Sequence, residues 1–120
     1  MFETISYKGK KIYYLDASGM TVNDMGKIKE SMAKVMNMLE NAPPKSALMI
    51  TNVSNVRFNS EMAELFKSYA DHNTPYVKAS ALVGVSGMQR VILTTVKKLT
   101  GRDFYLADNI QEAKDWVVEH

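Results

Sequence analysis

The stretch YVKASALVGVSGMQRVILTTVKKLTGR, residues 76–102, decides the fold of this chain. Residues 79–85 are uncharged and rich in small and β-branched side chains, which is typical of a strand covered on both faces. Gly84 and Gly87 flank a tight turn, and Ser86 and Gln89 have the spacing of a helix capping box. A helical stripe follows and ends before Gly101, where a helix terminator is expected; it comprises Met88, Val91, Ile92, Thr95, Val96 and Leu99. A strand that runs directly into such a helix predicts a βα unit.

The residues before this stretch predict a hairpin and a first helix. Two β-prone runs, residues 5–7 and 12–15, flank a glycine, which indicates an antiparallel hairpin. Residues 21–24 have capping-box spacing and open a helix that Pro43 and Pro44 stop. The apolar face of that helix comprises Val22, Met25, Ile28, Met32, Val35, Met36 and Leu39.

The remaining segments continue an alternation of strands and helices. Residues 46–53 predict a strand, and a helix follows from Asn59 or Ser60 until residues 72–75 break it. Its inward positions are Met62, Leu65, Phe66, Tyr69 and Ala70. Residues 104–106 predict a short strand, and a last helix follows with Asn109 as cap and Glu112 closing a capping box. Ile110, Ala113, Trp116 and Val117 would face the core.

The resulting element order is β-β-α-β-α-β-α-β-α, which predicts an α/β fold. After the hairpin, the alternation demands a mixed, mostly parallel sheet of five strands. A chain of 120 residues without a linker or repeat predicts one domain, residues 1–120.

The composition narrows the classes of function. The sequence contains no cysteine, which removes thiol nucleophiles, thiolate metal ligands and disulfides. Fifteen basic and thirteen acidic residues leave a net charge of +2, too weak and dispersed to favour a nucleic-acid partner. No run approaches the roughly 20 apolar residues of a membrane span. We therefore expect a soluble cytoplasmic protein with no metal site and no other cofactor.

Three short motifs sit within this element order: Tyr76-Val77-Lys78, Gly84-Val85-Ser86-Gly87 and Glu112-Ala113-Lys114-Asp115-Trp116. Together they resemble the bacterial SpoIIAA-like group of small single-domain proteins over nearly the whole chain. That group is related to STAS domains (sulfate transporter and anti-sigma factor antagonist) and is sometimes linked with CRAL-TRIO lipid-binding folds. The resemblance implies a sheet with helices stacked beside it, in a module that binds or regulates another protein without catalysis.

STAS antagonists carry a phosphorylatable serine in an Asp-Ser-Ser-Gly motif between the third strand and the next helix. At that place this chain has Asn59 for the aspartate, Ser60 for the first serine and Glu61 for the second, which is the serine that the family phosphorylates. Met62 replaces the glycine, so Ser60 is the only hydroxyl of the motif that is left for modification. The resemblance implies a partner or regulatory surface made of Asn52, Ser54, Asn55, Phe58, Asn59, Ser60 and Glu61.

The turn around Ser86 invites comparison with the nucleophile elbow of hydrolases. The elbow pattern is Gly-x-Ser-x-Gly, but Met88 stands where the second glycine belongs. His72 ends a helix and His120 is the last residue, so neither is a convincing base for a nucleophilic serine. We interpret Ser86 as a helix cap; the alternative is that the amides of Gly87 and Met88 receive a phosphate or carboxylate.

Polar residues also follow the ends of the strands. In open parallel sheets, ligands bind in the crevice outside the carboxyl ends of the strands, so these loops should converge on one rim. The candidate anion or ligand rim comprises Asp16, Ser18, Ser86, Gly87 and Met88. The alternative is that such Asx and Ser residues only cap helices and turns.

Two functions remain open from the sequence, and we do not expect an enzyme. The first is a protein-interaction module that uses residues 52–61 and the second helix. The alternative is a binder of a small apolar or amphipathic ligand such as a lipid, favoured by nine methionines, although core filling also explains most of them. Self-association through a sheet edge or a helix face, and a weak contact with lipid, are both compatible with the sequence.

Overall fold

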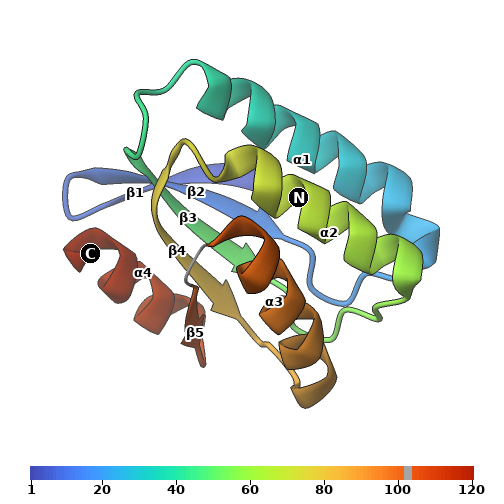
Figure 1. The fold of residues 1–120 in the computed structure, drawn as a ribbon. Coiled ribbons are helices and arrows are strands. Elements are labelled where there is room, and N and C mark those ends of the chain that lie inside the picture. Colours follow the sequence, from blue (N-terminus) through green and yellow to red (C-terminus); the bar gives the residue numbers. More distant parts are fainter. Residues whose placement is uncertain (102–103) are drawn as a thin grey trace.

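The computed structural model describes residues 1–101 and 104–120; for residues 88, 89, 92, 95, 96, 99 and 100 only the backbone is described. The elements follow the predicted order, with a 3-10 turn added before the first helix (Figure 1). They are β1 (Phe2–Tyr7), β2 (Lys10–Asp16), η1 (Val22–Asp24), α1 (Met25–Glu40), β3 (Ala47–Asn52), α2 (Ser60–Asn73), β4 (Val77–Val83), α3 (Gly87–Thr100), β5 (Tyr105–Ala107) and α4 (Ile110–Glu119).

The five strands form one mixed sheet in the order β1-β2-β3-β4-β5. β1 and β2 pair antiparallel, and every other neighbouring pair is parallel, as predicted. The hairpin turn consists of Lys8 and Gly9, both with positive φ (51° and 76°), as a type I′ turn requires. β4 lies between β3 and β5. The strand predicted from residues 79–85 is therefore an inner strand of the sheet.

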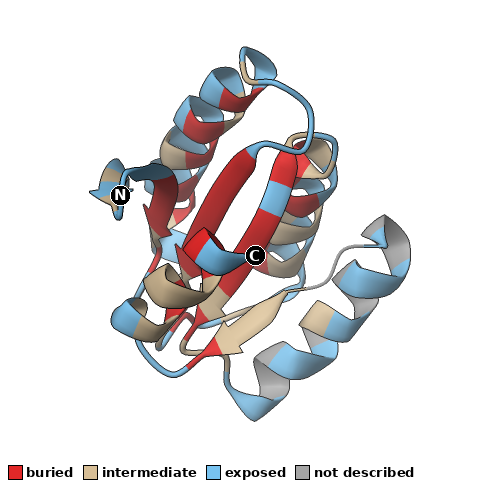
Figure 2. Cartoon of the chain, turned by 90° about the vertical axis from the view of Figure 1, so that its left-hand side faces the viewer, coloured by how far each residue is buried: buried red, intermediate tan, exposed pale blue. Residues whose placement is uncertain are grey.

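Helices cover both faces of the sheet (Figures 1 and 2). The buried side chains accordingly form two hydrophobic clusters. On one face, α1 and α2 pack on side chains such as Tyr13, Leu15 and Met49. On the other face, α4 buries Ala113 and Val117 against the opposite sides of the same strands. α3 lies beside α2. Among the described residues, no helix combines the length and the apolar character that crossing a bilayer requires.

The first helix begins as its capping box predicts, but one turn of 3-10 helix comes first. The Thr21 hydroxyl accepts a hydrogen bond from a backbone amide of η1, and the Asp24 carboxylate accepts one from the Thr21 amide at 2.9 Å. The predicted apolar face of α1 is confirmed at its buried positions, which are Met25, Ile28, Met32, Val35 and Leu39. Val22 was placed on that face wrongly: it lies in the 3-10 turn and is 43% exposed.

All five strands differ from their predicted ranges by one to three residues at an end, and one helix face also differs from the sequence prediction. The strand predicted at residues 79–85 ends at Val83, because Gly84 takes a φ of 80° that leaves extended geometry. The last strand is shifted by one residue, from 104–106 to Tyr105–Ala107. Val91 was predicted on the inward stripe of α3 but is 70% exposed, because its side of the helix faces solvent. The other side chains of that stripe, and Arg102, lie outside the described residues.

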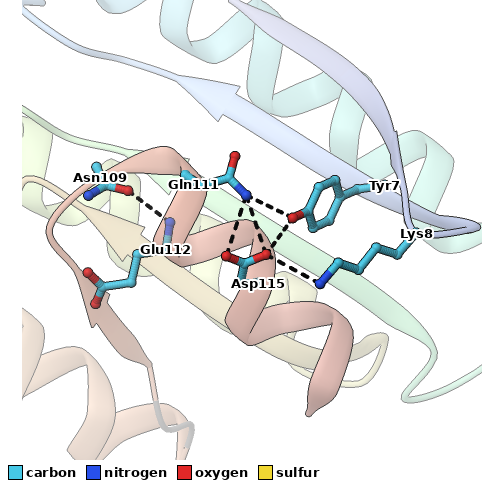
Figure 3. Close-up of polar contacts among 6 residues, drawn as sticks. All are labelled: Tyr7, Lys8, Asn109, Gln111, Glu112 and Asp115. Atoms are coloured by element: carbon cyan, nitrogen blue, oxygen red, sulfur yellow. Dashed lines mark hydrogen bonds and ion pairs between the residues drawn. The ribbon is translucent and has the colours of Figure 1, made fainter.

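A polar cluster ties α4 to the N-terminal hairpin (Figure 3). The Tyr7 hydroxyl donates to the Asp115 carboxylate, and the Gln111 amide donates to the Tyr7 hydroxyl at 2.8 Å. The Lys8 ammonium lies 3.6 Å from the same carboxylate. These contacts join residues more than 100 positions apart, so they fix the C-terminal helix against the start of the chain.

The predicted capping box of α4 forms only in part. The Asn109 side chain accepts a hydrogen bond from the Glu112 amide at 2.8 Å, as predicted. The Glu112 carboxylate instead accepts the hydroxyl of Tyr105 at 2.5 Å. Trp116, which was expected to face the core, is half-buried and stacks between the rings of Tyr105 and His120.

Candidate functional site

The loops at the carboxyl ends of the strands meet at one rim of the sheet, as their positions predicted. The Gly19 amide donates to the Ser54 carbonyl at 2.8 Å, which joins the loops after β2 and β3. The Val53 amide donates to the Val83 carbonyl at 2.9 Å, which extends the pairing of β3 with β4 into the loops. Gly84 approaches Ser54 so closely that a Cβ added to the glycine would lie 2.7 Å from the Ser54 Cα. The three loops therefore form one packed unit.

Most polar side chains of this rim are engaged within the rim itself. Asp16 accepts the Ser18 amide at 2.9 Å, and Asn52 accepts the Ser54 amide at 3.0 Å, so both aspartate and asparagine close Asx turns. The Asn52 amide group also donates to the Tyr14 hydroxyl at 3.2 Å. Burial raises the pKa of Tyr14 above its ordinary value, although the bond from Asn52 opposes the rise. These contacts give the rim side chains structural roles.

The segment predicted as a partner surface divides into a structural part and an exposed part. Asn59 caps α2 by accepting the Met62 amide at 2.8 Å. Phe58 packs its ring edge against Phe66, with ring centroids 5.3 Å apart, and belongs to the hydrophobic core. The other members of the segment that are exposed are Asn55, Ser60 and Glu61.

Ser86 lies at the start of α3, where its carbonyl accepts the Arg90 amide at 3.0 Å. Its side chain is exposed, Gly87 is the first residue of the helix, and the side chain of Met88 lies outside the described residues. His72 lies near the opposite end of β4, a strand of seven residues that spans roughly 20 Å. The structure therefore does not bring His72 and Ser86 together.

An apolar cavity of about 70 Å³ lies between the sheet, α2 and α3. Its floor comes from β3 and β4, which contribute Met49, Thr51, Ser80 and Leu82. Facing them across the cavity are aromatic side chains and one side chain of α3: Phe58, Phe66, Tyr69, Phe104 and Leu93. The sequence predicted neither this cavity nor its position, because its walls come from several elements between residues 49 and 104, which meet only in the folded chain.

One polar side chain of this cavity is completely buried. Asn73, the last residue of α2, is 0% exposed and lines the cavity. Its Oδ1 lies 3.0 Å from Nδ1 of His72, whereas its Nδ2 finds no hydrogen-bond partner among the described residues. A buried amide donor without a partner costs about 1–3 kcal/mol, so this group needs an explanation.

His72 connects Asn73 to the end of the first helix. Its Nε2 lies 2.9 Å from the Glu40 carboxylate, so the imidazole bridges α2 and α1. The hydrogen bond with Asn73 raises the pKa of His72 above its ordinary value; the Glu40 carboxylate adds to this rise, and partial burial opposes it. The protonated imidazole, with a donor on each nitrogen, is therefore favoured.

Sequence reasoning missed Asn73 because residues 72–75 were interpreted only as a helix end. A signal was present in the spacing of the inward positions of the second helix. Met62, Phe66 and Tyr69 recur at intervals of four and three, and the next step of four reaches Asn73. Extending the stripe by one turn would have placed an asparagine on the buried face.

Comparison with known proteins gives one informative likeness. No family model and no curated protein matches the sequence. Among solved structures, the chain is similar to the crystal structure of an uncharacterised protein of the DUF3478 family, with a SpoIIAA-like fold, from Shewanella loihica PV-4. The TM-score is 0.74 at 13% sequence identity, over 98% of this chain and 92% of that chain. The chain therefore has a SpoIIAA-like fold, which confirms the fold that the sequence resemblance implied.

Proposed function

We propose that this chain is a non-catalytic binding module, and that the cavity between the sheet, α2 and α3 receives the apolar part of a small molecule. The observation that supports this best is the chemistry of the cavity walls. Aromatic and aliphatic side chains form most of the surface, and a few polar groups, Thr51, Ser80 and Asn73, converge on the same space. Small-molecule sites in proteins combine an apolar wall with a few placed polar groups in this way.

The size of the cavity limits what enters it. An apolar cavity of roughly 150 Å³ holds a benzene molecule. A volume of about 70 Å³ therefore suits a group of about three or four non-hydrogen atoms. Six of the lining residues are partly exposed and mark where the rest of a longer ligand can leave the protein: Phe58, Phe66, Leu82, Val85, Leu93 and Phe104.

The titratable groups near the cavity favour binding over catalysis. Among the described lining residues, only Tyr69 carries an ionisable side chain. General acid–base catalysis works best with a group whose pKa lies near the working pH, which is far below that of an ordinary tyrosine. Histidine is the residue type that ordinarily suits this role, but both ring nitrogens of His72 are engaged, by Asn73 and by Glu40.

Two matched variants of α2 test the binding site. Ala70 lines the cavity, whereas Ala63 lies on the same helix and does not line it. At a 2-hexanone concentration ten times its Kd, wild type and Ala63→Val should gain about 1.4 kcal/mol, or about 5 °C in Tm. Ala70→Val fills the cavity with two methyl groups and should lose this gain. An equal gain in both variants, or no gain in the wild type, would contradict the proposal.

A second candidate function is the docking of a protein partner on the exposed part of residues 52–61. The exposure of Ser60 and Glu61 on the first turn of α2 favours it, because side chains there are open to a partner. A photo-crosslinking residue at Ser60 should capture a defined partner in cells. The same residue at Ser68, which is also exposed on α2, is the control. Identical adducts from the two positions would remove the case for this surface.

A further inference from the structure

We propose that Asn73 is the polar anchor of the cavity and selects an uncharged ligand that carries a carbonyl oxygen. The inference rests on the proposed function, since it names the class of molecule that the same cavity takes. Its foundation is a completely buried amide nitrogen, which has no hydrogen-bond partner among the described residues, beside an apolar space of limited size.

The first step of the argument concerns which atom of Asn73 meets the ligand. His72 occupies the amide oxygen through the 3.0 Å contact with its Nδ1, which leaves Nδ2 as the free end of the side chain. Nδ2 carries two donors and no acceptor. A ligand atom that satisfies it must therefore be an acceptor, and a ligand that leaves the donor unpaired should bind roughly 5- to 150-fold more weakly than one that pairs it.

The second step concerns charge. Among the described residues, no lysine, arginine or histidine side chain lines the cavity. A carboxylate or phosphate buried there would have no cation to pair with, and an unpaired buried charge is far more costly than a neutral acceptor. A ketone, ester or amide oxygen satisfies Nδ2 without that cost, whereas a fatty acid would have to keep its carboxylate outside.

The third step concerns the other polar groups of the cavity. Thr51, Ser80 and Tyr69 are buried, at 5%, 4% and 6% exposed. A hydroxyl group both donates and accepts, so none of the three discriminates between an acceptor and a donor on the ligand. Asn73 therefore determines which ligands bind, because its oxygen is already hydrogen-bonded to His72 and only its nitrogen donor meets the ligand.

His72 determines which end of the Asn73 amide faces the cavity. When the imidazole is protonated, Nδ1 donates to the Asn73 oxygen and Nε2 donates to Glu40, as the observed contacts require. In the neutral form one proton remains, and the ionised Glu40, which only accepts, keeps it on Nε2. Nδ1 is then an acceptor, and the amide turns to offer it Nδ2. The oxygen of Asn73 would then face the ligand and repel a carbonyl.

The remaining groups around His72 do not change the direction of this effect. Asp71 is its acidic neighbour on α2 and favours the protonated form. The ring of Tyr76 lies with its centroid 6.0 Å away. Lys29 of α1 lines a surface groove that His72 also lines. Affinity for a carbonyl ligand should therefore fall as the pH rises through the pKa of His72.

The test compares 2-hexanone with 2-methylhexane, in which a methyl group replaces the carbonyl oxygen. The Kd of each is measured at pH 5.5 from the methyl resonance of Met49, which lines the cavity. The ratio of the two Kd values should favour the ketone about 10-fold more in the wild type than in Asn73→Leu, because taking the ratio cancels the different hydration of the probes. The Asn73 side-chain amide resonances of the wild type should also shift with the ketone and not with the alkane.

The same binding measurements at a second pH distinguish a ligand-binding role of Asn73 from a purely structural role. In the wild type at pH 8.5 the preference for the ketone should disappear, whereas 2-hexanol, which both donates and accepts, should bind equally at both pH values. Glu40→Gln, which removes one cause of the raised His72 pKa, should move this loss to lower pH.

The outcomes distinguish failure of the inference from failure of the proposed function. If both probes bind and the ketone preference is the same in the wild type and in Asn73→Leu, the anchor role is wrong and the proposed function stands. If neither probe binds the wild type, both are wrong. If the ketone binds without moving the Asn73 amide resonances, the amide does not contact it, and the inference is overturned even if Asn73→Leu fails to fold.

Discussion

Replacing Gly84 with alanine should separate the loops that form the rim. Gly84 has a φ of 80°, where an L-residue is disfavoured by about 1–2 kcal/mol. Its new Cβ would overlap the Ser54 Oγ and would lie 2.7 Å from the Ser54 Cα. The hydroxyl can rotate away but the backbone cannot, so the loops must move apart at an additional cost of about 1–3 kcal/mol. We expect a total loss of about 2–5 kcal/mol, a large share of the stability of a small domain.

Gly19→Ala is the matched control for this prediction. Gly19 has a φ of 71°, but a Cβ there would meet nothing within 4 Å, so only the backbone term of about 1–2 kcal/mol applies. Urea unfolding followed by the fluorescence of Trp116, the single tryptophan, measures both variants. Adding Ser54→Gly to Gly84→Ala should recover part of the loss, because it removes the Ser54 side chain that the new methyl group would meet but leaves the Ser54 backbone in place. Equal losses in Gly84→Ala and Gly19→Ala would refute the reasoning.

Three further predictions test the buried core, the raised pKa of His72 and the hydrogen bond between Tyr7 and Asp115. Met62 is 0% exposed, so Met62→Ala should lower the unfolding free energy by about 2–5 kcal/mol. Met38 is 38% exposed, so Met38→Ala should change it by less than about 0.5 kcal/mol. Similar losses in the two variants would contradict the assigned core. His72 has a raised pKa when folded, so its stabilising contribution is complete below its ordinary pKa near 6.5 and is lost as pH rises through the folded value. The difference in unfolding free energy between wild type and His72→Gln should therefore shrink between pH 5.5 and pH 8.5, and a constant difference would count against the raised pKa. The hydrogen bond from Tyr7 is the main cause that lowers the pKa of Asp115. Tyr7→Phe should therefore raise that pKa towards its ordinary value in an NMR titration. An unchanged titration would contradict the hydrogen bond between Tyr7 and Asp115.

Much of the fold could be predicted from sequence because local signals and tertiary structure agree. Asn109 was identified as a cap from spacing alone, and it accepts the amide three residues ahead. The second helix was predicted to start at Asn59 or Ser60, and it starts at Ser60 with Asn59 as its cap. The inner position of β4 follows from its residues 79–83, which are uncharged and small or aliphatic, as a strand buried on both faces requires; the charged Lys78 lies near its start and is exposed. Where a residue type at a given spacing has a single structural role, as an asparagine has at a helix N-cap, the sequence alone predicts that role.

The cavity could not be predicted in the same way, because its walls belong to no single periodic pattern. Leu82 and Phe66 each look like ordinary core residues, and only the placement of α3 beside α2 leaves a space between them. The exposure of Val91 has the same origin, since an apolar side chain on a helical stripe is buried only if another element covers that side. Asn73 shows the limit most clearly: an asparagine near a proline indicates a helix end, and its burial depends on the strands beneath it.

The most direct test of the central claim is an intermolecular NOE measurement on the wild-type protein with 2-hexanone. If the cavity binds 2-hexanone through its acetyl end, the acetyl methyl group should give NOEs to the methyl groups of Met49 and Leu82, which line the cavity. Those NOEs should be absent in Ala70→Val and retained in Ala63→Val. NOEs confined to exposed side chains such as Met38, or the same NOEs in both variants, would contradict the claim.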